Sequence, residues 1–235
     1  MNSLESLILA VLEAKAVEIR DVDHGEKPFL YSSGNLGPGY IMMKGLVGRK
    51  DILKPLVREH ALKVVEFYPN VGFVAGNVSG GVIPGWILSE ELESLLGRSV
   101  PYVYVRETRK KGGQKELITG VNYMPQGSEG LIVEELVNFA QTTVNSAEVV
   151  RSAGFTVTHA ACILFYGNPE SIKSLNAHDL EMIYLFTLPE LLEVAERHGT
   201  HTPEAIQSFR DFLRDPLEWQ QKVRKLMPNA AGGTK

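Results

Sequence analysis

Hydrophobic positions follow two different spacings along this chain, and each spacing indicates one kind of secondary structure. Apolar residues recur every three or four positions over residues 3–16 and 49–67, which predicts an amphipathic helix in each segment. Residues 28–44 instead mix short apolar pieces with glycine and proline, a pattern typical of a hairpin or a cap of short strands.

Short apolar runs alternate with helical segments in the middle of the chain. The runs cover 71–76, 100–106, 130–136, 155–166 and 181–188, and helical spacing covers 82–96 and 142–153. Strands that are apolar throughout and separated by helices predict a parallel sheet with both faces covered. Such sheets bind ligands at the carboxyl ends of their strands, so chemistry is expected within 76–84, 106–115 and 134–143.

The order of these patterns divides the chain into three segments. Residues 1–46 hold the N-terminal helix and the short strands, residues 47–187 form an α/β core, and residues 188–235 form a helical extension. Within the extension, Thr202 and Asp215 each precede a proline, a pattern that marks helix starts. No long linker separates the segments, so the prediction is one compact α/β domain overall.

Composition and charge exclude several classes of function. The 235 residues are 44% hydrophobic and 22% charged, as in ordinary globular proteins. With 24 basic and 28 acidic residues the formal net charge is −4, so no basic excess predicts a nucleic-acid partner. No apolar run approaches the roughly 20 residues of a membrane span. The single cysteine, Cys162, cannot form an intramolecular disulfide, which predicts a reducing, cytoplasmic location.

Two segments that follow predicted strands are suited to anionic groups. Glycines within 76–81 allow close backbone approach, and the N–H groups of the next helix favour an anion, although a turn without a ligand explains this segment equally well. Basic residues and two glycines within 106–115 form a loop able to close over a phosphorylated substrate and neutralise a leaving anion. A solvated loop is the commoner meaning of such a charge run.

Two adjacent carboxylates, Glu134 and Glu135, end the apolar run at 130–136. Acids in this place can accept hydrogen bonds from sugar hydroxyls or hold a magnesium complex. Successive residues of a strand point to opposite faces, so the pair is expected to split, one acid toward a ligand and one toward a neighbouring segment. The alternative is a pair of solvated acids at a strand end.

These three segments together resemble the orotate phosphoribosyltransferases, within the type I phosphoribosyltransferases, and the resemblance covers nearly the whole chain. In the N-terminal half, residues 30–41 resemble the family's hood, residues 71–84 its pyrophosphate loop, and residues 96–106 the strand that leads into its catalytic loop. Further on, residues 117–120 resemble the strand after the catalytic loop, residues 131–135 the start of the 5-phosphoribosyl 1-pyrophosphate (PRPP) motif, and residues 148–154 the helix after that motif. The resemblance implies a central, mostly parallel sheet flanked by helices, with a small N-terminal hood and a helical C-terminal extension.

The resemblance also implies an activity. PRPP would transfer its phosphoribosyl group to a nucleobase, orotate first, and form orotidine 5′-phosphate and pyrophosphate in pyrimidine nucleotide biosynthesis. Mg²⁺ would be held through PRPP, with no metal ligand supplied directly by the chain. Because members of the family are commonly dimers, the resemblance implies a homodimer too, with neither nucleic acid nor membrane as a partner.

Position by position, the resemblance assigns roles to individual residues. Arg106, Arg109 and Lys110 would act on the departing pyrophosphate, and Glu134 and Glu135 would hold the ribose hydroxyls. Backbone donors to pyrophosphate would come from Asn77, Val78, Ser79, Gly80 and Gly81, the 5′-phosphate would meet Asn138, Gln141, Thr142 and Thr143, and the base would meet Tyr40, Lys44 and Tyr166.

Three departures from the family pattern lie inside these segments. The family's Thr-Thr-Gly-Gly-Ser-like phosphate loop is replaced by residues 138–142, where Ala140 and Gln141 resist the positive φ that glycine adopts freely. Glu107 falls where the catalytic loop has a second lysine. Residues 164–168 lack the Asp-Arg pair whose arginine can pair with the carboxylate of orotate, and tyrosine does not replace a bidentate arginine.

These departures keep two other hypotheses open. One is a non-catalytic protein that binds a nucleotide or a metabolite on the same fold, because fold alone does not determine function. The other is a transferase for a different base. Against a loss of chemistry, Glu134, Glu135, Arg106, Lys110 and the glycine turn are all present.

Overall fold

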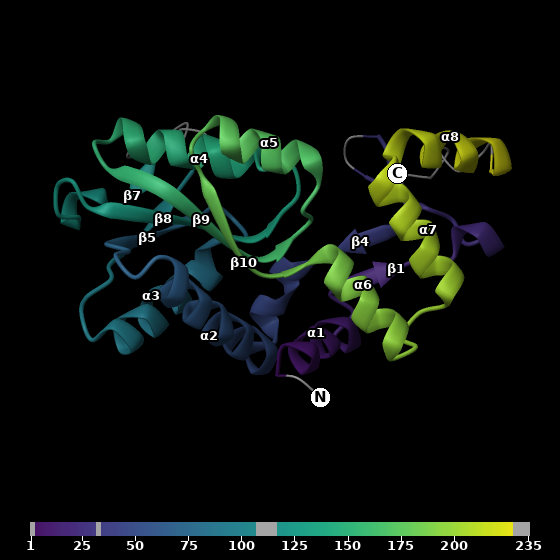
Figure 1. The fold of residues 1–235 in the computed structure, drawn as a ribbon, viewed down its shortest axis with the longest axis horizontal. Coiled ribbons are helices and arrows are strands. Elements are labelled where there is room, and N and C mark those ends of the chain that lie inside the picture. Colours follow the sequence, from purple (N-terminus) through teal and green to yellow (C-terminus); the bar gives the residue numbers. More distant parts are fainter. Residues whose placement is uncertain (1–2, 32–33, 107–116, 228–235) are drawn as a thin grey trace. The chain divides into compact units, whose positions relative to one another are not determined.

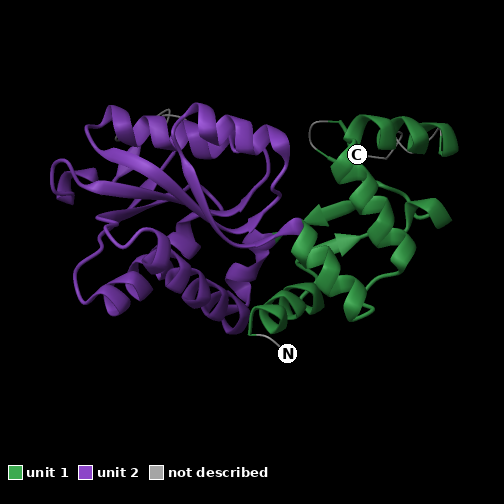
Figure 2. Cartoon of the chain, viewed as in Figure 1, with its two compact units in different colours: residues 1–42, 189–235 green, residues 43–188 purple. Residues whose placement is uncertain are grey.

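A computed structural model of the protein describes residues 3–31, 34–106 and 117–227. The chain forms two compact units, shown in different colours in Figure 2. Unit 1 comprises Met1–Met42 together with Pro189–Lys235, and unit 2 comprises Met43–Leu188.

Unit 2 is built on a six-stranded sheet in the order β10-β9-β8-β5-β6-β7. Its strands are β5 (Phe73–Asn77), β6 (Tyr102–Val105), β7 (Ile118–Thr119), β8 (Glu129–Val137), β9 (Thr156–Phe165) and β10 (Glu181–Thr187). Neighbouring strands pair in parallel except β6 and β7, which pair antiparallel. The predicted mostly parallel sheet is therefore confirmed, and each predicted apolar run coincides with one of its strands.

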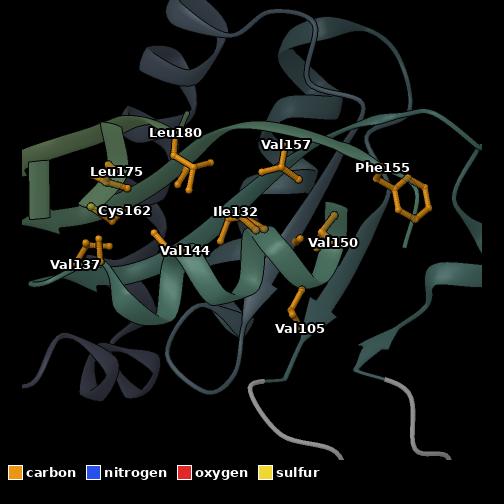
Figure 3. Close-up of a cluster of buried hydrophobic side chains, with 14 of the residues drawn as sticks. Val105, Ile132, Val137, Val144, Val150, Phe155, Val157, Cys162, Leu175 and Leu180 are labelled. Atoms are coloured by element: carbon orange, nitrogen blue, oxygen red, sulfur yellow. The ribbon is translucent and has the colours of Figure 1, made fainter. Parts of the chain in front are cut away.

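Helices cover both faces of this sheet, as Figure 1 shows. On one face α2 (Lys50–Phe67) packs beside α3 (Val82–Leu96), and on the other lie α4 (Gln141–Ser152) and α5 (Pro169–Ala177). Figure 3 shows the cluster of buried side chains around α4, to which Ile132, Val150 and Cys162 belong. Because both faces are covered, the strands are apolar on both sides, which explains their unbroken hydrophobic runs. The described part of unit 2 also contains the 3₁₀ helices η2 (Met43–Gly48) and η3 (Val121–Tyr123).

The chain reverses its direction across the sheet between β5 and β8. From β5 it passes through α3 to β6 on one side, whereas from β8 it passes through α4 to β9 on the other side. The two helices lie on opposite faces (Figure 1). Open α/β sheets bind ligands at such a switch point, so the carboxyl ends of β5 and β8 mark the candidate site.

Unit 1 combines the two ends of the chain. In the N-terminal part α1 (Ser3–Glu13) leads into β1 (Val17–Ile19), which pairs antiparallel with β4 (Gly39–Ile41). The helix η1 (Val22–His24) precedes a second antiparallel pair, β2 (Phe29–Leu30) and β3 (Leu36–Gly37). The helix predicted over 3–16 is shorter than expected, because Lys15 takes a φ of +54°, which ends a right-handed helix.

The C-terminal part of unit 1 is helical, as predicted. It consists of α6 (Leu188–Arg197), which begins at the boundary of the unit, α7 (Pro203–Arg214) and α8 (Pro216–Leu226). The side chains of Thr202 and Asp215 cap α7 and α8, with proline in the first turn of each helix. None of the helices within the described residues is long and apolar enough to cross a membrane.

Side chains from both ends of the chain form the apolar cluster of unit 1. Val22 and Leu36 come from the N-terminal part, and Trp219 and Val223 come from α8. The backbone N–H of Leu36 donates a hydrogen bond to Oε1 of Gln220 at 3.0 Å. The two terminal segments are therefore parts of one packed unit rather than separate additions.

Candidate active site

The turn between β5 and α3 brings its backbone against β8. The Val78 N–H donates to the Val105 carbonyl and the Gly81 N–H donates to the Asn77 carbonyl, both at 2.9 Å. A Cβ at Gly80 would overlap the Glu135 carboxylate, and a Cβ at Gly81 would overlap the Val133 carbonyl oxygen. Glycine is needed at Gly81 because a side chain there would meet backbone atoms, whereas a side chain at Gly80 would have to displace the Glu135 carboxylate.

Only some N–H groups of this turn remain available to a ligand. Those of Val78 and Gly81 are used inside the protein, and that of Val82 donates to the Ser79 carbonyl at 3.4 Å. The N–H groups of Ser79 and Gly80 have no hydrogen-bond partner among the residues that the structure describes. Of the predicted backbone donors to an anion, Ser79 and Gly80 are therefore the best placed.

The adjacent acids of β8 have different surroundings, as the strand alternation predicts. Glu134 is only 6% exposed, and its Oε1 accepts hydrogen bonds from Nδ2 of Asn77 at 2.5 Å and from Oγ1 of Thr142 at 3.1 Å. Glu135 is half-buried beside Gly80. Burial raises the pKa of the Glu135 carboxyl above its ordinary value, and the positive charge of Lys44 acts in the opposite direction.

The loop between β8 and α4 corrects one expectation from the sequence. Ala140 was expected to resist a positive φ, yet it adopts the left-handed conformation with φ +61° and ψ +9°. Its methyl group is buried in the hydrophobic cluster around α4, which favours this placement. Nδ2 of Asn168 donates to both the backbone carbonyl and Oδ1 of Asn138, each at 2.9 Å, and so holds the start of the loop.

The first turn of α4 offers backbone N–H groups rather than side chains. The cap residue Ala140 makes no side-chain cap, and the N–H groups of residues 141–143 have no hydrogen-bond partner among the described residues. Such groups, together with the helix dipole, attract an anion. The side chains turn elsewhere: that of Gln141 donates to Asn145, that of Thr142 donates to Glu134, and that of Thr143 is fully buried.

The other predicted residues are divided between the described and undescribed parts of the chain. Arg106 follows β6, where its N–H donates to the Leu117 carbonyl at 2.8 Å and its guanidinium lies 5.2 Å from the ring centre of Tyr104. Arg109 and Lys110 lie outside the described residues. Lys44 and Tyr166 belong to unit 2, and Tyr40 belongs to β4 of unit 1.

Asn168 is a site residue to which the sequence analysis gave no role. It caps α5 by accepting the Ser171 N–H at 2.8 Å, and it also holds Asn138. An asparagine directly before a proline is a common helix start, so its capping role was readable from the sequence. Its contact with Asn138 was not, because that contact joins residues 30 positions apart.

Comparisons with known proteins agree with this geometry. The chain is 30% identical over 202 residues to the orotate phosphoribosyltransferase of Ruegeria sp. (strain TM1040), covering 85% of this chain and 86% of the relative. It is 24% identical over 220 residues to the same enzyme of Porphyromonas gingivalis, covering 93% of this chain and 99% of the relative. A scan of protein-family models finds no match.

Solved structures share the fold. The chain superposes on Leishmania donovani UMP synthase with a TM-score of 0.68 at 23% identity, covering 91% of this chain and 42% of that longer chain. On orotate phosphoribosyltransferase from Aeropyrum pernix the TM-score is 0.66 at 22% identity, covering 83% of this chain and 99% of that chain. With sequence relatives aligned over most of its length, the chain belongs to the orotate phosphoribosyltransferase family.

Proposed function

We propose that the protein transfers the phosphoribosyl group of PRPP to orotate in pyrimidine nucleotide biosynthesis. A ring nitrogen of orotate gives up its N–H proton to solvent and forms a bond to C1 of the ribose. The bond from C1 to the pyrophosphate oxygen breaks, and this oxygen keeps the electron pair. The products are orotidine 5′-phosphate and pyrophosphate. One observation carries this proposal. The glycine turn, Glu135 and the N–H groups at the start of α4 that lack a partner among the described residues all lie at the carboxyl ends of β5 and β8.

The described backbone supplies two places for the charged ends of PRPP. The N–H groups of Ser79 and Gly80 would receive pyrophosphate, and those of residues 141–143 would receive the 5′-phosphate. Glu135, half-buried beside Gly80, would accept hydrogen bonds from ribose hydroxyls. The absence of the family's glycines from residues 138–142 leaves the backbone N–H groups of residues 141–143 in place to receive a phosphate.

Mg²⁺ suits this arrangement as a companion of PRPP. Among the described residues no group of three or more His, Cys, Asp or Glu gathers as a metal site. The Glu135 carboxylate is a hard oxygen donor of the kind that Mg²⁺ prefers, and PRPP would supply further oxygens. When bound, the ion would neutralise charge on the pyrophosphate.

The basic segment after β6 is assigned to the leaving group. Arg106, Arg109 and Lys110 would neutralise the negative charge that develops on pyrophosphate as the bond to C1 breaks. We expect Lys110→Ala to lower kcat for orotate about 100-fold with little change in PRPP affinity, because this charge develops mainly in the transition state. Lys111→Ala is the matched control in the same segment, with kcat within about threefold of the wild type. Equal losses in both variants would contradict the role of Lys110.

The deciding experiment measures PRPP binding by calorimetry with and without Mg²⁺, followed by orotate consumption. Saturable, Mg²⁺-dependent binding and turnover support the proposal. Absence of binding at millimolar PRPP, weaker than about −4 kcal/mol, would favour a non-catalytic protein on this fold. Binding of PRPP without orotate turnover would favour another base, since residues 164–168 contain no arginine.

Two finer properties belong to the same proposal, a location argued from the single cysteine and a homodimer implied by the family resemblance. We place the enzyme in the cytoplasm, because its single cysteine is a buried thiol that suits a reducing compartment. We also propose a homodimer. Light scattering at micromolar concentration tests this directly, and a mass close to that of one 26.0 kDa chain would contradict it.

A further inference from the structure

One oxygen of the Glu134 carboxylate joins two segments that are far apart in the sequence. Asn77 ends β5 and donates to this oxygen through Nδ2 at 2.5 Å. Thr142 lies in the first turn of α4 and donates to the same oxygen through Oγ1 at 3.1 Å. Glu134 therefore connects the strand that leads into the glycine turn with the helix whose N–H groups are assigned to the 5′-phosphate.

The burial of this group suits a connecting role better than contact with a ligand. Asn77 is 1% exposed and Glu134 is 6% exposed, whereas Glu135 is half-buried and borders Gly80. A buried carboxylate is costly unless it is hydrogen-bonded, and here two donors converge on it. The neighbouring acids thus occupy different environments, as the alternation along the strand predicts, although the family resemblance assigned both of them to the ribose hydroxyls.

We propose that Glu134 is a positioning residue. Through its hydrogen bonds with Asn77 and Thr142 it fixes the glycine turn after β5 and the start of α4 relative to each other, and Glu135 alone contacts the ribose. This inference rests on the proposed function. It differs from the expectation that both acids hold ribose hydroxyls, because Glu134 acts through Asn77 and Thr142 rather than on the substrate.

An exchange of the amide and the carboxylate tests the pairing. Asn77→Asp places a second carboxylate against the first, and the like charges repel each other. Adding Glu134→Gln restores one amide and one carboxylate in the same space. The new amide nitrogen takes the place of the shared oxygen, and it can donate one hydrogen to the carboxylate at position 77 and the other to the hydroxyl oxygen of Thr142. A residue that contacted ribose directly would gain nothing from this exchange.

We expect Asn77→Asp to weaken PRPP binding and raise the KM for PRPP about tenfold or more, with a smaller change in kcat. The double variant should bind PRPP within about threefold of Glu134→Gln alone. Losses that multiply in the double variant would overturn the proposal. Ser146→Ala is the control, because it removes a buried hydroxyl of α4 that has no partner among the described residues.

A second pair of variants and a ligand-free measurement keep the test decisive if Asn77→Asp fails to fold. Thr142→Val removes the second donor and should raise the KM for PRPP. Thr142→Ser keeps the hydroxyl and should have a KM for PRPP close to that of the wild type. Equal KM values for the two variants would overturn the proposal. If the wild type binds no PRPP, the proposed function fails. The contact between Asn77 and Glu134 is then tested by the thermal unfolding midpoints of Asn77→Asp, Glu134→Gln and the double variant. A shift in the double variant equal to the sum of the two single shifts would overturn the proposal.

Discussion

Two strand-to-helix turns stand on neighbouring strands, and they shape the backbone with different residues. The turn from β5 to α3 uses Gly80 and Gly81, whose missing Cβ atoms leave room for the Glu135 carboxylate and the Val133 carbonyl. The loop from β8 to α4 contains no glycine; Ala140 takes the left-handed conformation, and Asn168 holds the loop from α5. In the first turn, lack of space limits which residues can replace glycine. In the second turn, the main cost is the left-handed conformation of Ala140.

This difference explains how the second loop forms its left-handed turn without glycine. A left-handed alanine costs about 1–2 kcal/mol, a sum that a buried methyl group and two hydrogen bonds can offset. No such offset is available at Gly81, where an added carbon would meet backbone atoms of a central strand. The two turns should therefore respond very differently to the exchange of glycine and alanine.

The largest effect is expected for Gly81→Ala. The added carbon would meet the Val133 carbonyl oxygen, so backbone must move, and we expect a loss of about 2–3 kcal/mol in the free energy of unfolding. Urea denaturation measures it. The control is Gly48→Ala, whose added carbon meets nothing within 4 Å and should change stability by less than about 0.5 kcal/mol. Similar values for the two variants would show that crowding does not limit the first turn.

An intermediate effect is expected for Asn168→Ala, which removes the cap of α5 and both hydrogen bonds to Asn138. We expect a loss of about 2 kcal/mol in the free energy of unfolding. Asn168→Asp separates the two roles, because a carboxylate still caps the helix but cannot donate to Asn138. If this variant were as stable as the wild type, the cap would account for the whole effect.

The smallest effect is expected for Ala140→Gly. Relief of the left-handed conformation is offset by the lost methyl burial and by the greater freedom of glycine in the unfolded chain, so stability should change by less than about 1 kcal/mol. Ala147→Gly, in the buried interior of α4, should cost about 2 kcal/mol because nothing compensates. Comparable losses in the same denaturation assay would mean that Ala140 carries no conformational cost.

The fold of unit 2 was predictable because its strands are apolar on both sides and its helices are periodic. The predicted segment at 130–136 lies within β8, and the predicted helix at 82–96 matches α3 residue for residue. Local pattern sufficed there, since burial on both faces leaves little freedom in composition.

The site was only partly predictable, because its key contacts depend on tertiary packing. Sequence reasoning found the acids of β8 and the glycine turn, and it anticipated that the acids would separate. It did not find that Asn77 and Thr142 converge on Glu134, which joins residues 57 and 8 positions apart. It also misjudged Ala140, where packing overrides the local preference of the backbone.

Unit 1 is formed by two segments that lie on either side of unit 2 in the sequence, and this has a consequence for folding during synthesis on the ribosome. Val22 and Leu36 are synthesised before residues 43–188, whereas Trp219 and Val223, which pack against them, are synthesised after those residues. Residues 43–188 can emerge and collapse around their own sheet in the meantime, since domains fold as units during synthesis. The N-terminal part of unit 1 is thus made before unit 2, and its apolar cluster is completed only after α8 has been synthesised.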